Sequence, residues 1–199
     1  MSEDGSSPET VHPFRYSHVV GFDDFPFRRE WRGNIPIVGV VYAGLRMEGV
    51  LSGAIRRDGA NATAVLTRLV QQSKWVESIG LVLLQGVALG GFNVIDVQSL
   101  HRTLQVPVLV VARRAPNVPA VREALINHVR GGTRKWRLIE SLGPMEPCAG
   151  VFVQRAGLTL ADASQVITRY AVHGAVPEPL RAAHLIAGGI ATGQSRGRT

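Results

Sequence analysis

The pattern of apolar and polar positions along the chain changes near Asp58. Before this residue, short runs rich in β-branched side chains predict three strands, at residues 18–22, 35–42 and 49–55. The first run stops at the acidic pair Asp23 and Asp24, and the segment Ala43-Gly44-Leu45-Arg46 fits a hairpin between the second and third runs. Short connections between successive strands predict an antiparallel meander.

Beyond Asp58 the apolar positions recur at helical spacing and predict a helix that reaches Lys74. A strand (79–84), a glycine-rich loop (85–91), a helix (93–104) and a further strand (107–112) follow. This alternation is typical of parallel strands joined by right-handed crossovers. The remaining pattern predicts helices at 118–129, 134–141, 160–170 and from Pro177 to about 190, with 151–154 as a candidate late strand.

These elements predict an α/β fold built on a mixed five-stranded sheet. Its first three strands are antiparallel, and right-handed crossover sets the fourth strand beside the first, which gives the order 3-2-1-4-5. The order reverses between strands one and four, and ligands bind such sheets beyond the carboxyl ends of these strands. We therefore expect a functional site where Asp23, Asp24 and Gln85 follow these two strands.

Composition fits one soluble domain, since 45% of the 199 residues are hydrophobic and 19% are charged. We expect a flexible leader at 1–16, a single domain at 17–192 and a basic tail at 193–199. The longest apolar runs fall well short of the ~20 residues that cross a bilayer. The start of the chain lacks the basic and apolar regions of a signal peptide, so we expect a cytoplasmic protein without membrane contact.

The charge balance favours a polyanionic partner. The 22 Lys and Arg residues exceed the 15 Asp and Glu residues and give a formal charge of +7, almost entirely from arginine. Arginine binds phosphate bidentately, and pairs of arginines flank predicted strand ends at 28–29, 56–57 and 113–114. A general coding bias toward arginine explains most of these residues equally well.

The acidic residues at the strand ends are candidates for a metal site. Asp23 and Asp24 follow the first strand, and Asp58 follows the third, which runs in the same direction. Clustered carboxylate oxygens suit Mg²⁺ or Mn²⁺, and such ions activate water and stabilise the leaving oxygen in phosphodiester hydrolysis. Two adjacent carboxylates repel one another without a cation, which favours this interpretation for Asp23 and Asp24. Asp58-Gly59 is also a good turn pair, and for Asp58 alone a helix cap is the favoured interpretation.

Other classes of site find little support in the sequence. Cys148 is the single cysteine, so neither an internal disulfide nor a cysteine-based zinc site is expected. The glycine-rich loop lacks a Walker lysine, and no nucleophile elbow is present. The histidines are not clustered, and His184 fits a hydrogen-bonded core residue better than a ligand.

Several sequence blocks together resemble the endonuclease dU family over about residues 16–198. The most specific are Gly90-Gly91-Phe92-Asn93-Val94-Ile95-Asp96 and Pro177-Glu178-Pro179-Leu180-Arg181, with Val20-Gly21-Phe22-Asp23-Asp24-Phe25-Pro26-Phe27 and Ser195-Arg196-Gly197-Arg198 in support. The resemblance implies a ribonuclease-H-like fold, distantly related to endonuclease V. It also implies a metal-dependent DNA endonuclease that acts on deaminated bases, with deoxyuridine as the named lesion.

The resemblance also implies roles for individual residues. Asp23 matches the metal-binding aspartate of the first strand, and Asp58 matches the carboxylate that opens the first helix. Asp24 is expected to assist, and Gln85 to be a secondary contact. The residues expected to contact nucleic acid are Arg28, Arg29, Arg57, Arg113, Arg181 and Arg196.

The chain departs from the expected pattern at three positions. Gln85 stands where a fourth-strand aspartate is expected, Leu158 where endonuclease V has a histidine, and Gln194 where a glutamate is expected. A glutamine offers a neutral oxygen, so metal affinity and water activation should both weaken. Two interpretations stay open: compensation by Asp24, Glu48 or Asp96, or a catalytically impaired relative that still binds nucleic acid. A small-molecule hydrolase or regulatory protein is a third alternative.

Overall fold

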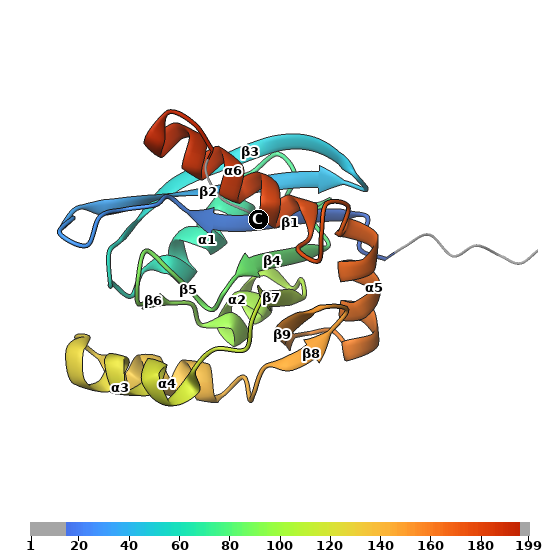
Figure 1. Cartoon of the computed structure of the whole chain (residues 1–199). Helices are drawn as coiled ribbons and strands as arrows, with labels where there is room; N and C mark the ends of the chain where they lie inside the picture. The colour runs from blue at the N-terminus through green and yellow to red at the C-terminus, as the bar shows by residue number, and fades with distance from the viewer. Residues whose placement is uncertain (1–14, 196–199) are drawn as a thin grey trace, which may run out of the picture.

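A seven-stranded mixed sheet forms the centre of the computed structural model, which describes residues 15–195 (Figure 1). The strand order is β3-β2-β1-β4-β7-β9-β8. These strands are β1 (His18–Asp24), β2 (Asn34–Ala43), β3 (Arg46–Arg56), β4 (Leu81–Gln85), β7 (Val108–Ala112), β8 (Glu146–Cys148) and β9 (Val151–Ala156). The antiparallel β3-β2-β1 meander and the parallel β1, β4 and β7 confirm the predicted order.

The prediction of five strands was wrong at the far edge of the sheet. The candidate strand at 151–154 is β9, which pairs antiparallel with β7, and β8 pairs with β9. β8 has three residues and contains Pro147, which is tolerated because β8 is an edge strand. Such a short segment with a proline carries no strand signal of its own.

The glycine-rich loop after β4 is also more ordered than predicted. Residues 88–89 (β5, Ala88–Leu89) and 93–94 (β6, Asn93–Val94) form a small antiparallel hairpin. Helix α2 (Val97–Leu104) consequently starts four residues later than the predicted residue 93 and is capped by Asp96, whose side chain accepts a hydrogen bond from the Ser99 amide.

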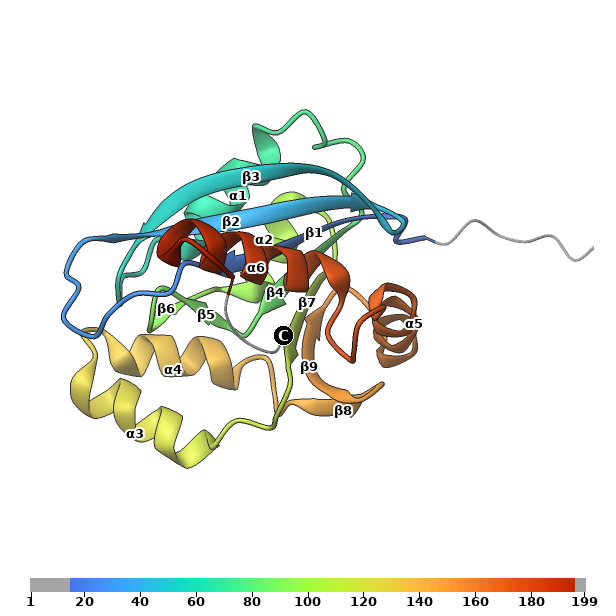
Figure 2. The ribbon, with the colours of Figure 1, turned by 45° about the horizontal axis from the view of Figure 1, so that its top comes forward.

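Helices cover both faces of the sheet (Figure 2). Helices α1 (Ala62–Gln71) and α2 pack on the face that buries Val20 and Phe22. Helices α5 (Leu160–Tyr170) and α6 (Glu178–Thr192) pack on the opposite face with Val19. Helices α3 (Val118–His128) and α4 (Gly132–Glu140) form a hairpin after β7.

Helix α6 crosses β1 at very close range. A Cβ atom at Gly21 would lie 2.6 Å from the backbone carbon of Pro179, so no larger residue fits at this point of β1. This close crossing brings the first turns of α6 over the strand that ends in Asp23 and Asp24.

The predicted leader and tail fall mostly outside residues 15–195, and so does Arg196. Within this range no helix is long and apolar enough to span a membrane.

Candidate functional site

Asp23 lies at the carboxyl end of β1, on the face of the sheet that α6 covers. It is 5% exposed, and its Oδ2 atom lies 2.9 Å from Nδ1 of His184. Its Oδ1 atom accepts a hydrogen bond of 2.9 Å from the Asp24 amide. Burial raises the pKa of Asp23, and the hydrogen bond from His184 opposes this shift. The result is a carboxylate held in one orientation at the strand edge.

His184 is a candidate site residue, because it contacts Asp23, and the sequence did not predict this contact. It is hydrogen-bonded as expected, but its side chain is 37% exposed and lies at the edge of the sheet instead of in the core. Its neighbours Leu180, Ala183 and Ala187 are fully buried. Their helical spacing places His184 beside the buried stripe, and this is the signal that the sequence offered.

Asp24 points to the opposite face of the sheet, because successive side chains of a strand alternate. Its Oδ2 atom accepts a hydrogen bond of 2.9 Å from the Gly90 amide. Burial and the neighbouring charge of Asp23 raise the pKa of Asp24 to about 6, although the Gly90 amide opposes this shift.

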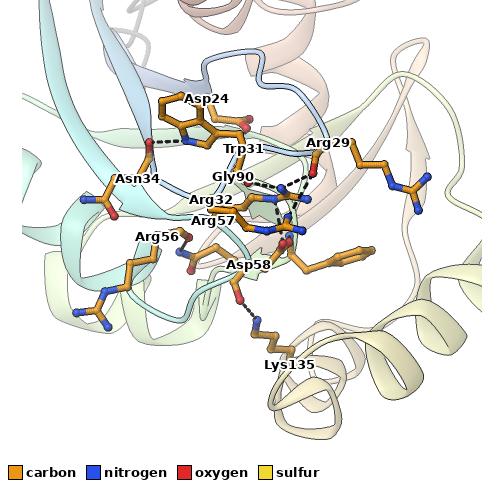
Figure 3. Close-up of polar contacts among 12 residues, drawn as sticks. Asp24, Arg29, Trp31, Arg32, Asn34, Arg56, Arg57, Asp58, Gly90 and Lys135 are labelled. Carbon is orange, nitrogen blue, oxygen red and sulfur yellow. Dashed lines mark hydrogen bonds and ion pairs between the residues drawn. The ribbon is translucent and has the colours of Figure 1, made fainter.

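Asp58 also hydrogen-bonds to Gly90 (Figure 3). Its amide donates to the Gly90 carbonyl at 2.9 Å. Its Oδ1 atom accepts from the Phe92 amide at 2.8 Å, and its Oδ2 atom lies 3.2 Å from Nε of Arg57. Nζ of the buried Lys135 donates to the Asp58 carbonyl at 2.6 Å. Asp58 is therefore a structural centre of this edge, with both carboxylate oxygens already engaged.

These contacts explain why the Gly-Gly-Phe-Asn block has glycines and an asparagine at these positions. Gly90 and Gly91 both have positive φ, and a Cβ atom at Gly91 would lie 2.4 Å from Oδ1 of Asp58. Asn93 is fully buried, accepts from the Ala62 amide at 3.0 Å and donates to the Arg56 carbonyl at 2.8 Å. The block therefore joins the end of β3, the start of α1 and Asp24 into one unit.

Gln85 shares a face and an edge with Asp23. Phe22 pairs with Leu84 in the parallel β1–β4 ladder and packs in the same apolar layer. The next residues, Asp23 and Gln85, therefore both face the α6 side. Gln85 is partly exposed and lines a cavity of about 210 Å³ with Gly86, Arg113 and Leu180.

The predicted ligands Asp23 and Asp58 engage different partners, His184 in one case and Phe92 and Arg57 in the other. Within residues 15–195 no three His, Cys, Asp or Glu side chains could hold a metal ion together. Mg²⁺ is nevertheless often held by one or two carboxylates together with substrate phosphates and water. A cation beside Asp23 would offset the burial that raises its pKa, and the Gln85 amide oxygen is a hard neutral donor. The donors on this face therefore fit an ion shared with a phosphate.

The predicted nucleic-acid contacts separate into two groups. Arg28, Arg29 and Arg113 are exposed at the ends of β1 and β7. Arg57 and Arg181 form ion pairs with acidic residues of this chain. Arg57 pairs with Asp58, and Nε of Arg181 lies 2.9 Å from Oε1 of Glu178. Two of the three departures from the family pattern are also placed. Leu158 packs in the apolar layer under α5 and α6, and the Gln194 carbonyl accepts from the Thr192 hydroxyl.

A second, mainly apolar cavity of about 420 Å³ opens next to Gln85. Gly86 and Val87 form one wall, and α3, α4 and the segment before β8 form the others. Its apolar lining includes Pro116, Val121, Trp136, Ile139 and Met145.

The model of the family described as endonuclease dU matches residues 15–191. The chain belongs to this family. The UPF0215 protein of Deinococcus radiodurans is 56% identical over 184 residues, which are 92% of this chain and 94% of the relative. The UPF0215 protein of Methanosarcina acetivorans is 38% identical over 187 residues, which are 90% and 93% of the two chains.

Solved structures establish the fold of this endonuclease dU family member. A crystal structure from Archaeoglobus fulgidus, described as a protein of unknown function, superposes with a TM-score of 0.82 at 33% identity and covers 88% of this chain and 98% of that one. Endonuclease V of Bacillus subtilis gives 0.61 at 11% identity, covering 94% and 86%. Endonuclease V of Ciona intestinalis, in complex with DNA that contains inosine, gives 0.54 at 13% identity, covering 84% and 82%. The fold is therefore ribonuclease-H-like, as expected.

Proposed function

We propose that this protein is a divalent-metal-dependent DNA endonuclease that acts at deaminated bases, with deoxyuridine as the first candidate. The observation that carries the proposal is the pair formed by Asp23 and His184 at the carboxyl end of β1. Membership of the endonuclease dU family and the endonuclease V-like fold support it.

The reaction would take place at the edge where Asp23 and Gln85 meet. Their oxygens would hold Mg²⁺ or Mn²⁺ together with a phosphate of the substrate. When bound, this ion supplies activation of water and stabilisation of the leaving oxygen. Asp23 is held for this task by its bonds to His184 and to the Asp24 amide.

His184 is suited to proton exchange at the same edge. When Nδ1 donates its proton to Asp23, the partly exposed ring offers Nε2 as the acceptor. The carboxylate then orients the imidazole. Such an imidazole can accept a proton from water or return one to a leaving oxygen.

The cavity of about 420 Å³ beside Gly86 supports recognition of a single base. Enzymes that act at one nucleotide commonly turn its base out of the helix into a pocket. This cavity is large enough for a pyrimidine or a purine, and the flat Trp136 side chain is part of its lining. Its wall begins at Gly86, one residue beyond Gln85, at the carboxyl end of β4.

A second candidate function is nucleic-acid binding without cleavage. It is favoured by the neutral Gln85 and by the contacts of Asp58, which binds Phe92 and Arg57 and does not join Asp23 and Gln85. The arginines on the β1–β2 loop would serve both functions equally.

Incision of a labelled duplex with a single deoxyuridine tests the proposal, with Mg²⁺, Mn²⁺ or chelator and an undamaged duplex as control. We expect metal-dependent incision near the lesion that Asp23→Asn removes. The matched control Glu77→Gln alters an exposed carboxylate in the turn after α1 and should cleave normally. Salt-sensitive DNA binding without incision would instead establish the second candidate.

A further inference from the structure

The loop that joins β1 to β2 presents an aromatic ring among cations. Residues 25–33 connect Asp24 to β2, and the side chains of Arg28, Arg29 and Arg32 on this loop are exposed. Trp31 lies between Glu30 and Arg32 in the sequence, and 52% of its surface is exposed; with three arginines and one glutamate the loop is net basic. The loop starts at the acidic strand end, so whatever binds to it lies next to Asp23 and Asp24.

The loop is held in place by Arg57 from beneath (Figure 3). The guanidinium of Arg57 donates to the carbonyls of Arg29 and Trp31 and lies 5.5 Å from the centre of the Phe27 ring. Its Nε is 3.2 Å from Asp58, which is itself bonded to the Gly-Gly-Phe-Asn block. The positions of the exposed arginines and of Trp31 are therefore tied to the same unit that holds Asp24.

The indole of Trp31 is also fixed. Its Nε1 donates to the Asn34 carbonyl at 3.2 Å, and its backbone amide donates to the Arg28 carbonyl at 3.0 Å. A Cβ atom at Gly33 would lie 3.0 Å from the ring, so the indole rests on the loop backbone there. A flat apolar surface that is held still while half exposed suits a flat partner.

We propose that Trp31 is a stacking platform for an unpaired nucleobase, and that Arg28, Arg29 and Arg32 bind the phosphates on either side of that nucleotide. This inference rests on the proposed function and specifies its substrate: a single strand or an unpaired nucleotide next to the cleavage edge. Aromatic side chains framed by cations bind single strands in this way, because every base has a face on which to stack. A fully paired duplex does not offer such a face.

The test is the affinity for a fluorescein-labelled single-stranded oligonucleotide and for its fully paired duplex, measured by anisotropy at several salt concentrations with chelator. We expect Trp31→Ala to weaken single-strand binding roughly 5- to 100-fold and Trp31→Phe to recover most of that affinity. The dependence on salt should be unchanged, because no charge is removed. Leu45→Ala, an equally exposed apolar truncation at the β2–β3 turn, should bind like the unaltered protein.

Two outcomes would overturn the inference alone: equal single-strand affinity for Trp31→Ala and the unaltered protein, or an equal loss of affinity for the paired duplex. If the unaltered protein binds neither DNA at low salt, the proposed function fails and this inference fails with it.

Discussion

At the scale of single residues, folding shifts the pKa values of the carboxylates at the candidate site. Asp24 is the clearest case, because burial and the charge of Asp23 raise its pKa to about 6. The folded chain therefore binds this proton more tightly than the unfolded chain does. The stability that comes from binding this proton is fully present below about pH 4 and is lost as the pH rises toward 6.

Asp24→Asn should remove this penalty while keeping an oxygen for the Gly90 amide. We expect the variant to be more stable than the unaltered protein by roughly 2–3 kcal/mol at pH 7.5 and nearly equal to it at pH 4. Urea unfolding at both pH values, with chelator present, measures the difference. Equal stabilities at pH 7.5 would show that Asp24 has an ordinary pKa.

Gly91 is required by its surroundings and not by backbone conformation alone. Alanine at this position meets both the left-handed φ of +83° and the Asp58 carboxylate, whereas Gly44 has a φ of +57° with nothing within 4 Å of an added Cβ. Gly44→Ala should cost about 1 kcal/mol of unfolding free energy, and Gly91→Ala about 1–3 kcal/mol more. Chemical denaturation compares them, and equal losses would contradict the close contact with Asp58.

At the scale of elements, the sequence predicted best where a local signal was complete. Helix α5 spans the predicted 160–170 because Thr159 and Asp162 form a capping box at its start. Helix α2 was predicted too early, because Asn93 and Val94 pair with β5 in a hairpin whose two-residue strands are too short to show a periodic signal. β8 was missed because its three residues include Pro147.

The hydrogen bonds between α5 and the two residues before β1 give a prediction at this scale. The buried Tyr170 hydroxyl donates to the carbonyls of Tyr16 and Ser17 at 2.8 and 3.0 Å, and burial raises its pKa to about 12. Tyr170→Phe should lose roughly 1–3 kcal/mol at neutral pH, because the buried Tyr16 carbonyl loses a partner, whereas the Ser17 carbonyl keeps the Gly44 amide.

The same contact predicts alkaline behaviour. The folded chain holds the Tyr170 proton above pH 10, so this part of its stability is lost as the pH rises from about 10 to 12. Thermal unfolding of both proteins across this range should show the difference between them shrinking. A difference independent of pH would mean that the hydroxyl titrates normally.

At the scale of the whole molecule, strand order predicted part of the candidate site, and the packing of helices supplied the rest. The order of β1 and β4 was sufficient to place Asp23 and Gln85 at one edge. His184 is 161 residues from Asp23, and Lys135 is 77 residues from Asp58. Both contacts depend on how helices dock, and no spacing in the sequence encodes that docking. The roles of Asp58 and of the exposed arginines stay predictions.

The exposed arginines of the β1–β2 loop give a prediction for DNA binding by the molecule as a whole. Replacing Arg28 and Arg29 together by alanine should lower the slope of log affinity for DNA against log salt by about 1.5 to 2. A double alanine variant of Arg68 and Arg102, exposed on α1 and α2, removes equal charge from another surface. Equal effects of the two double variants would mean that the β1–β2 loop has no special role.

We propose above that Asp23 and Gln85 form the metal-dependent edge of a nuclease. The most direct test is the single-turnover rate of deoxyuridine incision as a function of Mg²⁺ concentration for the unaltered protein, Asp23→Asn and Gln85→Asp. We predict that Asp23→Asn loses at least about 100-fold in rate, roughly 3 kcal/mol of transition-state stabilisation. Gln85→Asp should reach half its maximal rate at a lower Mg²⁺ concentration than the unaltered protein. Incision by Asp23→Asn at the rate of the unaltered protein would contradict a metal-binding role of Asp23.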